Sequence, residues 1–371
     1  MAHKYKIDIW ILIPVLMLML FSIGAVFSAS STFALEKFQD SNYLIKQHAV
    51  KIILSIVIIF IAARVDYINL EGISKPLIWI TIGLLIFTLF SSKGPIKGAS
   101  RWIELGPLSF QPSEFARYAI IIYVANLLAK KKDYINLLYR GYLPVLFYIL
   151  LITGLILIQP NFSVASIIFM TCMLMMYLSE AKRKHIIITM ASLIPFAVLF
   201  VLSKDYIMDR ITSYSEYKSS GNSSYQLQQA LIGFGNGGLF GIGPGNSNQK
   251  DFFLPEAHGD FIFSIIGEEY GFIGTFIILC LYFIIAVRGY RIAKECRDEF
   301  GKYLAFGITT LITLNALVNM SVASGVIPTT GVTLPLVSYG GTSIIFTAAA
   351  IGVLLNISSH SDDIDEVLTI E

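Results

Sequence analysis

Ionisable side chains cluster where a long polar segment meets an apolar one, around the stretch LPEAHGDFIFSIIGEEYG at residues 254–271. A charged group is costly in a lipid bilayer, so such residues usually face a cavity or a partner and serve a function. Asp260 stands at the junction, where water, a charged head group and an acyl tail can meet. A carboxylate there can act as a general base or hold a divalent cation. The alternative is an N-cap for a helix that starts at Phe261. The cluster consists of Lys250, Glu256, His258, Asp260, Glu268 and Glu269.

The other acids of this stretch have two interpretations each. Glu268 and Glu269 lie two turns into the expected helix, and adjacent helical residues point about 100° apart. One therefore faces the bundle core and the other a neighbouring helix, or both are structural partners of buried arginine or backbone donors. Glu256 and His258 are candidate substrate-binding residues, with solvated loop positions as the alternative.

A Gly-rich outer loop, KGPIKGASRWIELGPLSFQPS at residues 93–113, carries two cations, Lys97 and Arg101. Cations near backbone amides suit a pyrophosphate, and arginine can bind it through two parallel hydrogen bonds. The alternative is interfacial anchoring, helped by Trp102 at the level of the lipid head groups.

Glu114 and Arg117 follow in QPSEFAR, and their spacing puts them on one face of a helix, close enough to pair. Pro112 suits the entry of that helix. Such a pair is often only structural, but this one can also orient the loop cations just before it.

The run PTTGVTLPLVSYGGTS at residues 328–343 cannot form one regular helix, because its prolines and glycines interrupt it. Broken backbone of this kind lines cavities or re-enters the membrane. Ser338 is its candidate binding residue. A plain outer turn between two spans is the alternative.

The composition indicates a polytopic membrane protein: charged residues are 14% of the chain, against about 25% in a soluble domain. A spanning helix needs about 20 apolar residues. No basic stripe suits nucleic acid, and no pair of the three cysteines is typical of a disulfide or metal site. We predict an all-α fold with ten spans, at residues 9–29, 48–64, 76–92, 113–129, 142–158, 164–180, 186–203, 261–287, 303–325 and 341–358.

The distribution of Lys and Arg sets the orientation. With the N-terminus inside, the inner segments carry 16 of these residues and the longer outer segments carry 9. Positive charge marks the cytoplasmic side, so both termini are predicted to be cytoplasmic. Residues 1–371 form a single transmembrane domain with an extracytoplasmic loop at 204–260. A short cytoplasmic tail at 359–371 is predicted, with a disordered acidic end.

The chain resembles the SEDS family of bacterial shape, elongation, division and sporulation proteins across essentially all its spans. KGASRWIELGPLSFQPSE and LPEAHGDFIFSIIGEE match two family blocks. GNSNQKDFFLPEAHGDFIF is closer to the FtsW branch than to the RodA branch. One departure is QPNFS at 159–163, where Asn161 replaces the usual aspartate and Ser163 the usual glycine. The family's C-terminal sequence signature is matched by Asn319, Gly325, Pro328, Gly331, Pro335 and the run from Ser338 to Ser343.

The resemblance implies a peptidoglycan glycosyltransferase of the bacterial inner membrane that polymerises lipid II. It assigns the family's proposed catalytic aspartate to Asp260, motif basic residues to Lys97, Arg101 and Arg117, and their acidic partner to Glu114. It also implies a class B penicillin-binding protein and other divisome or elongasome membrane proteins as partners. Mg²⁺ or another divalent cation is a possible cofactor, with Asp260 as a possible ligand.

Two other classes of function fit the residues. Broken helices and intramembrane charges also suit a lipid II flippase or other transporter. The acids lie at the outer edge, with no charge ladder across the midplane, and this favours surface chemistry. A non-catalytic scaffold that positions a penicillin-binding protein is the third class, and the dense acidic and basic sites argue against it.

Overall fold

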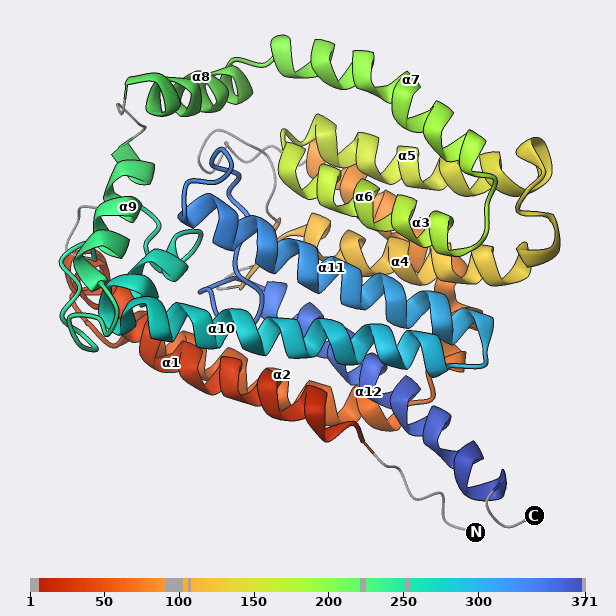
Figure 1. Cartoon of the computed structure of the whole chain (residues 1–371), viewed down its shortest axis with the longest axis horizontal. Coiled ribbons are helices and arrows are strands. Elements are labelled where there is room, and N and C mark those ends of the chain that lie inside the picture. The colour runs from red at the N-terminus through yellow and green to blue at the C-terminus, as the bar shows by residue number, and fades with distance from the viewer. Residues whose placement is uncertain (1–6, 91–102, 106–107, 221–224, 251–253, 369–371) are drawn as a thin grey trace.

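The computed structural model describes residues 7–90, 103–105, 108–220, 225–250 and 254–368. Long helices run side by side through most of the described chain, and one short antiparallel hairpin joins them (Figure 1). The elements are α1 (Ile9–Phe38), α2 (Tyr43–Arg64), α3 (Ile68–Phe90), β1 (Ile103–Leu105), β2 (Leu108–Phe110), α4 (Pro112–Lys130), η1 (Lys132–Tyr134), η2 (Leu138–Tyr142), α5 (Leu143–Ile158), α6 (Phe162–Leu178), α7 (Arg183–Leu202), α8 (Asp205–Ser220), α9 (Tyr225–Gly237), α10 (Ile262–Glu295), α11 (Glu299–Ala323) and α12 (Ser343–Leu368).

The predicted all-α membrane architecture is confirmed, apart from the unpredicted hairpin β1–β2. Helices α1–α7 and α10–α12 each overlap one of the predicted spans. Eight of the described helices are long and apolar enough to cross a bilayer, and α6 is a shorter apolar helix of 17 residues. The remaining one, α4, has 19 residues and buries the charged pair Glu114 and Arg117.

Several helices extend beyond the predicted spans. The 30 residues of α1 would measure about 45 Å, longer than the hydrocarbon core of about 30 Å. Hydropathy falls at the Ser/Thr-rich turn 28–32, but the helix continues to Phe38. Its last turns therefore stand at the same end of the bundle as the start of α2.

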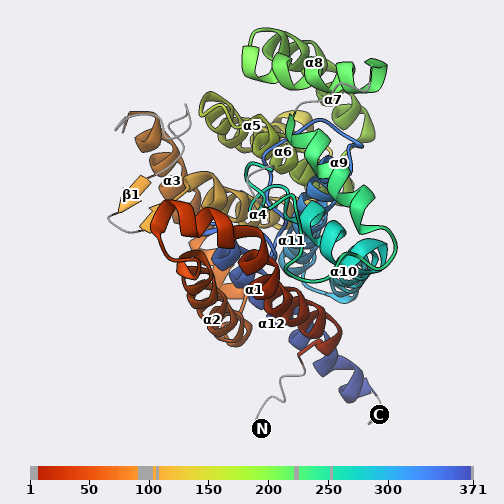
Figure 2. The ribbon, with the colours of Figure 1, turned by 90° about the vertical axis from the view of Figure 1, so that its left-hand side faces the viewer.

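The predicted loop 204–260 contains two helices that the sequence analysis did not predict, α8 and α9. The buried residues of α9 are Leu227, Ala230, Gly233 and Gly237, which recur every three or four positions. This spacing forms one buried face, and α9 packs with it against α10. Figure 2 views this end of the bundle, with α8, α9 and the hairpin around it.

The Gly-rich segment 237–245 compensates for a break in α10. Gly271 interrupts that helix with φ 64° and ψ −162°, a conformation that side chains disfavour. The backbone groups around the break pair with the segment instead: Ile242 N–H donates to Glu268 O, and Phe272 N–H donates to Gly238 O. A Cβ at Gly241 would collide with the backbone of α10, so this close approach requires glycine.

The predicted disordered tail is also wrong in part, because α12 continues to Leu368. The reason lies in the pattern: Ile364, Val367 and Leu368 keep a helical three- and four-residue spacing.

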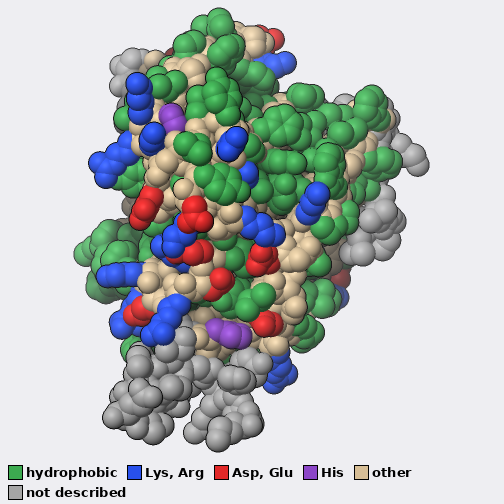
Figure 3. Space-filling model, turned by 90° about the vertical axis from the view of Figure 1, so that its right-hand side faces the viewer, with side chains coloured by type: hydrophobic (Ala, Val, Ile, Leu, Met, Phe, Trp, Pro, Cys, Tyr) green, Lys and Arg blue, Asp and Glu red, His purple; other side chains and the backbone are tan. Residues whose placement is uncertain are grey.

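Helix α1 begins and α12 ends at one end of the bundle (Figure 1). Lysine and arginine side chains gather on that end, which faces the viewer in Figure 3. The segments between α4 and α5, α6 and α7, and α10 and α11 meet there (Figure 1). The start of α1 and the end of α12 therefore lie at the same end of the bundle, and the cytoplasmic location of that end stays a prediction.

Candidate functional site

Asp260 lies at the opposite end of the bundle, immediately before α10. Phe261 is the N-cap residue of that helix and makes no side-chain capping bond. The N-cap alternative for Asp260 is therefore wrong by one position. The carbonyl of Asp260 accepts a hydrogen bond of 2.8 Å from Asn319 Nδ2, and its side chain is half-buried.

The Asp260 carboxylate faces Gly331 in the company of an arginine. A Cβ added at Gly331 would lie 3.5 Å from Asp260 Oδ2 and 3.9 Å from Arg210 Nη2. Gly331 has φ 75°, and its missing side chain leaves room for both charged groups. Arg210 comes from α8, and its Nη1 donates to the carbonyl of Thr330 over 3.2 Å. A carboxylate and a guanidinium thus share one small space at this end of the bundle.

The carbonyl of Thr330 accepts hydrogen bonds from two other parts of the chain, the first of which is Arg210 of α8. It also accepts a hydrogen bond of 2.9 Å from Ser163 Oγ at the start of α6. Ser163 is the residue expected to be glycine from the sequence resemblance, and its hydroxyl supplies this bond. Tyr214 OH donates to the carbonyl of Val326 over 2.6 Å. Helix α8 is therefore tethered to the segment 324–331 at two points.

Within the irregular segment 324–342, residues 332–338 are mostly buried, whereas Ser324, Val326 and Gly331 are exposed. A simple outer turn therefore describes only part of this segment. Ser338 Oγ donates to Gly259 O over 2.7 Å and accepts from Leu334 N–H over 2.8 Å. Tyr339 N–H donates to His258 O over 2.8 Å. Both bonds fix residues 258–260. The Ser338 hydroxyl is thus engaged with backbone on both sides, and its contact with a substrate stays a prediction.

Glu114 and Arg117 form the predicted pair. Arg117 Nη2 lies 2.9 Å from Glu114 Oε1, and both side chains are buried. Arg117 Nη1 also donates to Asn315 Oδ1 over 3.3 Å. Asn315 is one turn before Asn319 on α11, so the two contacts lie about 6 Å apart along that helix. One helix therefore connects the buried ion pair with the Asp260 backbone.

Glu256 and His258 line a cavity of about 350 Å³ between the C-terminal end of α1 and the N-terminal end of α2. The His258 ring lies 5.3 Å from Phe33 and 5.6 Å from Tyr339, measured between centroids. The Tyr339 hydroxyl donates to Gln47 Oε1 over 2.8 Å. His258 therefore faces α1 and α2, whereas Asp260 faces Gly331 and α8.

Lys97 and Arg101 lie outside the described residues. Their predicted role at a pyrophosphate stays a prediction.

Glu268 and Glu269 are both buried and point to different neighbours, as expected from their adjacency. Glu268 accepts from Asn236 Nδ2, Ser247 Oγ and the backbone N–H of Gln249. Glu269 accepts from Ser28 Oγ on α1. Within the described chain these donors are amides and hydroxyls, not arginine. Both acids hold structural elements in place.

Sequence reasoning missed two cations. Arg210 counted only as an outer positive charge, because nothing in its polar surroundings predicts a neighbour 50 residues away. Lys51 stands on α2, where its Nζ donates to Gly340 O over 3.1 Å and lies 4.6 Å from the Tyr339 ring centroid. A cation within an apolar span was the available signal, since such residues are usually functional.

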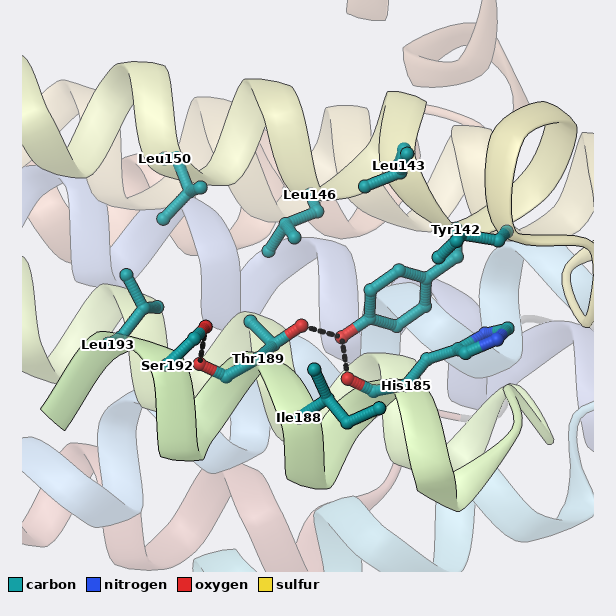
Figure 4. A pocket seen from close by; sticks show the side chains of 10 residues that line it. Tyr142, Leu143, Leu146, Leu150, His185, Ile188, Thr189, Ser192 and Leu193 are labelled. Carbon is teal, nitrogen blue, oxygen red and sulfur yellow. Dashed lines mark hydrogen bonds between the residues drawn. The ribbon is translucent and has the colours of Figure 1, made fainter.

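A second cavity, of about 280 Å³, lies between α5 and α7 (Figure 4). Its lining is mostly leucine and isoleucine, and Tyr142 OH bonds there with His185 O and Thr189 Oγ1 at 3.2 and 2.7 Å. Tyr142 and His185 stand near the starts of α5 and α7, at the basic end of the bundle. This cavity is therefore remote from Asp260.

The sequence profile of the FtsW, RodA and SpoVE proteins, described as cell cycle protein, matches residues 9–363. The chain belongs to this family. It is 36% identical over 357 residues to the probable peptidoglycan glycosyltransferase FtsW of Geobacter metallireducens, covering 96% of this chain and 95% of the relative. It is 37% identical over 362 residues to the stage V sporulation protein E of Bacillus subtilis, covering 97% and 99%.

Solved structures share the fold at lower identity. A chain of a peptidoglycan synthase complex that coordinates polymerization and crosslinking has a TM-score of 0.79 at 24% identity, over 96% of this chain and 98% of that one. The rod shape determining protein RodA of Thermus thermophilus has a TM-score of 0.69 at 24% identity, over 96% and 97%. The family membership agrees with the sequence resemblance, and this chain is a multi-pass membrane protein.

Proposed function

We propose that this chain is a peptidoglycan glycosyltransferase that polymerises lipid II into β1,4-linked glycan during cell division or elongation. The observation that carries the proposal is the half-buried carboxylate of Asp260, which shares the space at Gly331 with the guanidinium of Arg210. Relatives named peptidoglycan glycosyltransferase FtsW support the reaction class. The site belongs to the extracytoplasmic face of the bacterial cytoplasmic membrane, with both termini in the cytoplasm.

The reaction joins the 4-hydroxyl of an acceptor GlcNAc to the anomeric carbon of a donor MurNAc. Asp260 accepts the hydroxyl proton as the new C–O bond forms. The bond from the anomeric carbon to the pyrophosphate breaks, and undecaprenyl pyrophosphate leaves with the electron pair. Because the donor linkage is α and the product is β, the carbon inverts in one displacement. A positioned base of this kind is typically worth about 10²–10⁴ in rate.

Cations stabilise the charge that develops on the leaving pyrophosphate. Arg210 is one, because it stands beside Asp260, and Lys97 and Arg101 are the others by resemblance. Donors fixed before the reaction need no rearrangement as charge develops. The tethers of α8 at Thr330 and Val326 hold Arg210 in this way.

A divalent cation is a further proposal. The described residues contain no group of three or more metal-ligand side chains. Asp260 would supply one oxygen and the pyrophosphate the rest, as Mg²⁺ commonly binds through one or two carboxylates and substrate phosphates. The ion would add positive charge at the leaving group.

The deciding experiment is polymerisation of lipid II by the purified chain, alone and with a class B penicillin-binding protein as the proposed partner. Glycan strands that form with the partner, in a reaction that EDTA weakens, support the proposal and its cation. Absence of polymer, together with transbilayer movement of lipid II in proteoliposomes, would replace it with the flippase hypothesis.

A further inference from the structure

The stretch 256–260 separates two compartments. On one side Asp260 Oδ2 faces Gly331, with Arg210 of α8 close by. On the other side Glu256 and His258 line the cavity against α1 and α2. The bonds from Ser338 to Gly259 O and from Tyr339 to His258 O hold the stretch between them. A reaction between two glycan-bearing lipids needs two places for sugars, and the Asp260 side has Arg210 close to the carboxylate for the leaving group.

Aromatic rings form the walls of the α1–α2 cavity. Phe38 and Tyr43 stack at 4.2 Å between centroids. Phe33, Phe38 and Tyr43 are each more than a third exposed. Half-exposed rings at a cavity can stack on a flat apolar face. A pyranose ring has such a face, made by its C–H groups, and a hydroxyl-bearing rim around it.

The polar groups of the cavity suit hydroxyls and amides better than phosphate or hydrocarbon. Lys37 and Glu256 line it together, so it has no surplus of positive charge to select an anion. Gln47 and His258 add further hydrogen-bonding groups. An acyl chain would have to pack against the charged side chains of Lys37 and Glu256, which is costly. A volume of about 350 Å³ lies at the small end of ligand sites, about 300–1,000 Å³.

We infer that the α1–α2 cavity, lined by Phe33, Lys37, Tyr43, Gln47, Glu256 and His258, is a saccharide subsite that holds amino-sugar rings of the glycan beside the reaction centre. The inference rests on the proposed function, because it assigns one part of that substrate to one compartment. The rings pack on Tyr43, and Gln47, Glu256 and His258 bond the hydroxyl and acetamide groups.

Binding of a soluble glycan tests the inference without requiring catalysis. The probe is a tetrasaccharide of alternating GlcNAc and MurNAc that lacks lipid and peptide, with maltotetraose as the reference sugar. Saturation-transfer NMR on the full chain in nanodiscs measures its affinity. Tyr43→Ala should bind the probe about 3- to 10-fold more weakly, the factor expected for a lost ring contact. Tyr43→Phe keeps the ring and should bind normally.

Two controls separate this inference from the proposed function. Tyr225→Ala removes a half-exposed ring of α9 outside the cavity and should bind the probe normally. Asp260→Asn should also bind normally, because Asp260 faces the other compartment. Loss of probe binding in Asp260→Asn, equal binding by Tyr43→Ala, or no binding above that of maltotetraose would each overturn the subsite. Normal polymerisation by Asp260→Asn would instead refute the catalytic assignment and leave the subsite intact.

Discussion

Asn319 Nδ2 donates hydrogen bonds to the carbonyls of both Asp260 and Val332, over 2.8 and 2.7 Å. The buried amide thus ties the residue before α10 to the residue after Gly331. These two stretches of backbone bring Asp260 and Gly331 together. The position of the candidate base therefore depends on Asn319 of α11, which lies 59 residues further along the chain.

Asp260→Asn should abolish polymerisation while the protein still folds and inserts. The amide keeps the size of the side chain but cannot accept the proton, so the rate should fall by about 10²–10⁴. Glycan formed from lipid II with the class B partner is the measurement. Asp205→Asn, at an exposed position of α8, is the matched control and should polymerise normally. Near wild-type activity of the Asp260 variant would refute its role as base.

Arg210→Gln should lower the turnover by about 10²-fold, the effect of losing one fixed donor at a developing charge. The turnover of Arg210→Lys should fall between those of the wild type and of Arg210→Gln, since lysine keeps the charge but lacks the planar donor pair. Single-turnover polymerisation at saturating lipid II separates this effect from binding. Arg291→Lys changes an exposed residue on the basic end and serves as the control. If Arg210→Gln and Arg210→Lys turn over as fast as the control Arg291→Lys, Arg210 has no part in the reaction.

Asn319→Leu should destabilise the fold as well as reduce activity. The part-buried carbonyl of Asp260 and the buried carbonyl of Val332 would lose their donor, at about 1–3 kcal/mol for each. The thermal midpoint in detergent should drop, whereas Asn69→Leu at an exposed position of α3 should leave it nearly unchanged. An unchanged midpoint in the Asn319 variant would contradict the tethering role.

The buried pair of Glu114 and Arg117 should show strong coupling. Removing one partner, as in Arg117→Met, leaves a buried charge and should cost about 3–5 kcal/mol, and the double variant with Glu114→Leu should recover part of it. The exposed pair of Arg291 and Glu295 is the reference and should couple by about 0–1 kcal/mol. The coupling energy of each pair is obtained from the free energies of unfolding of the wild type, the two single variants and the double variant. Equal coupling energies in the two pairs would contradict burial as the cause.

The orientation can be tested with single cysteines in a background whose three native cysteines are replaced by serine. An impermeant maleimide should label Ser215→Cys on α8 in intact spheroplasts. It should label Asn136→Cys, between α4 and α5, only after permeabilisation, and both positions are exposed. The reverse pattern would invert the topology. Burial raises the pKa of the native Cys296 thiol, so this residue is a poor reporter.

The sequence by itself determined the membrane class, the ten apolar segments and the Glu114–Arg117 pair, because these depend on composition and on spacing within one helix. It also singled out Asp260, since an acid at the boundary of an apolar segment is visible in one dimension. It did not predict α8 and α9. Their helical structure coexists with a polar composition, and contacts with α10 and the segment 324–331 stabilise it.

Only the tertiary structure decided what stands around Asp260. Arg210, Ser163 and Asn319 come from three helices far apart in the chain, and their meeting at Thr330, Gly331 and Val332 depends on how α6, α8 and α11 pack. The same packing turned His258 toward α1 and α2 although it is two residues from Asp260. Long-range hydrogen bonds of this kind leave no periodic trace in the sequence, because each requires one donor at one distance and not a repeating pattern.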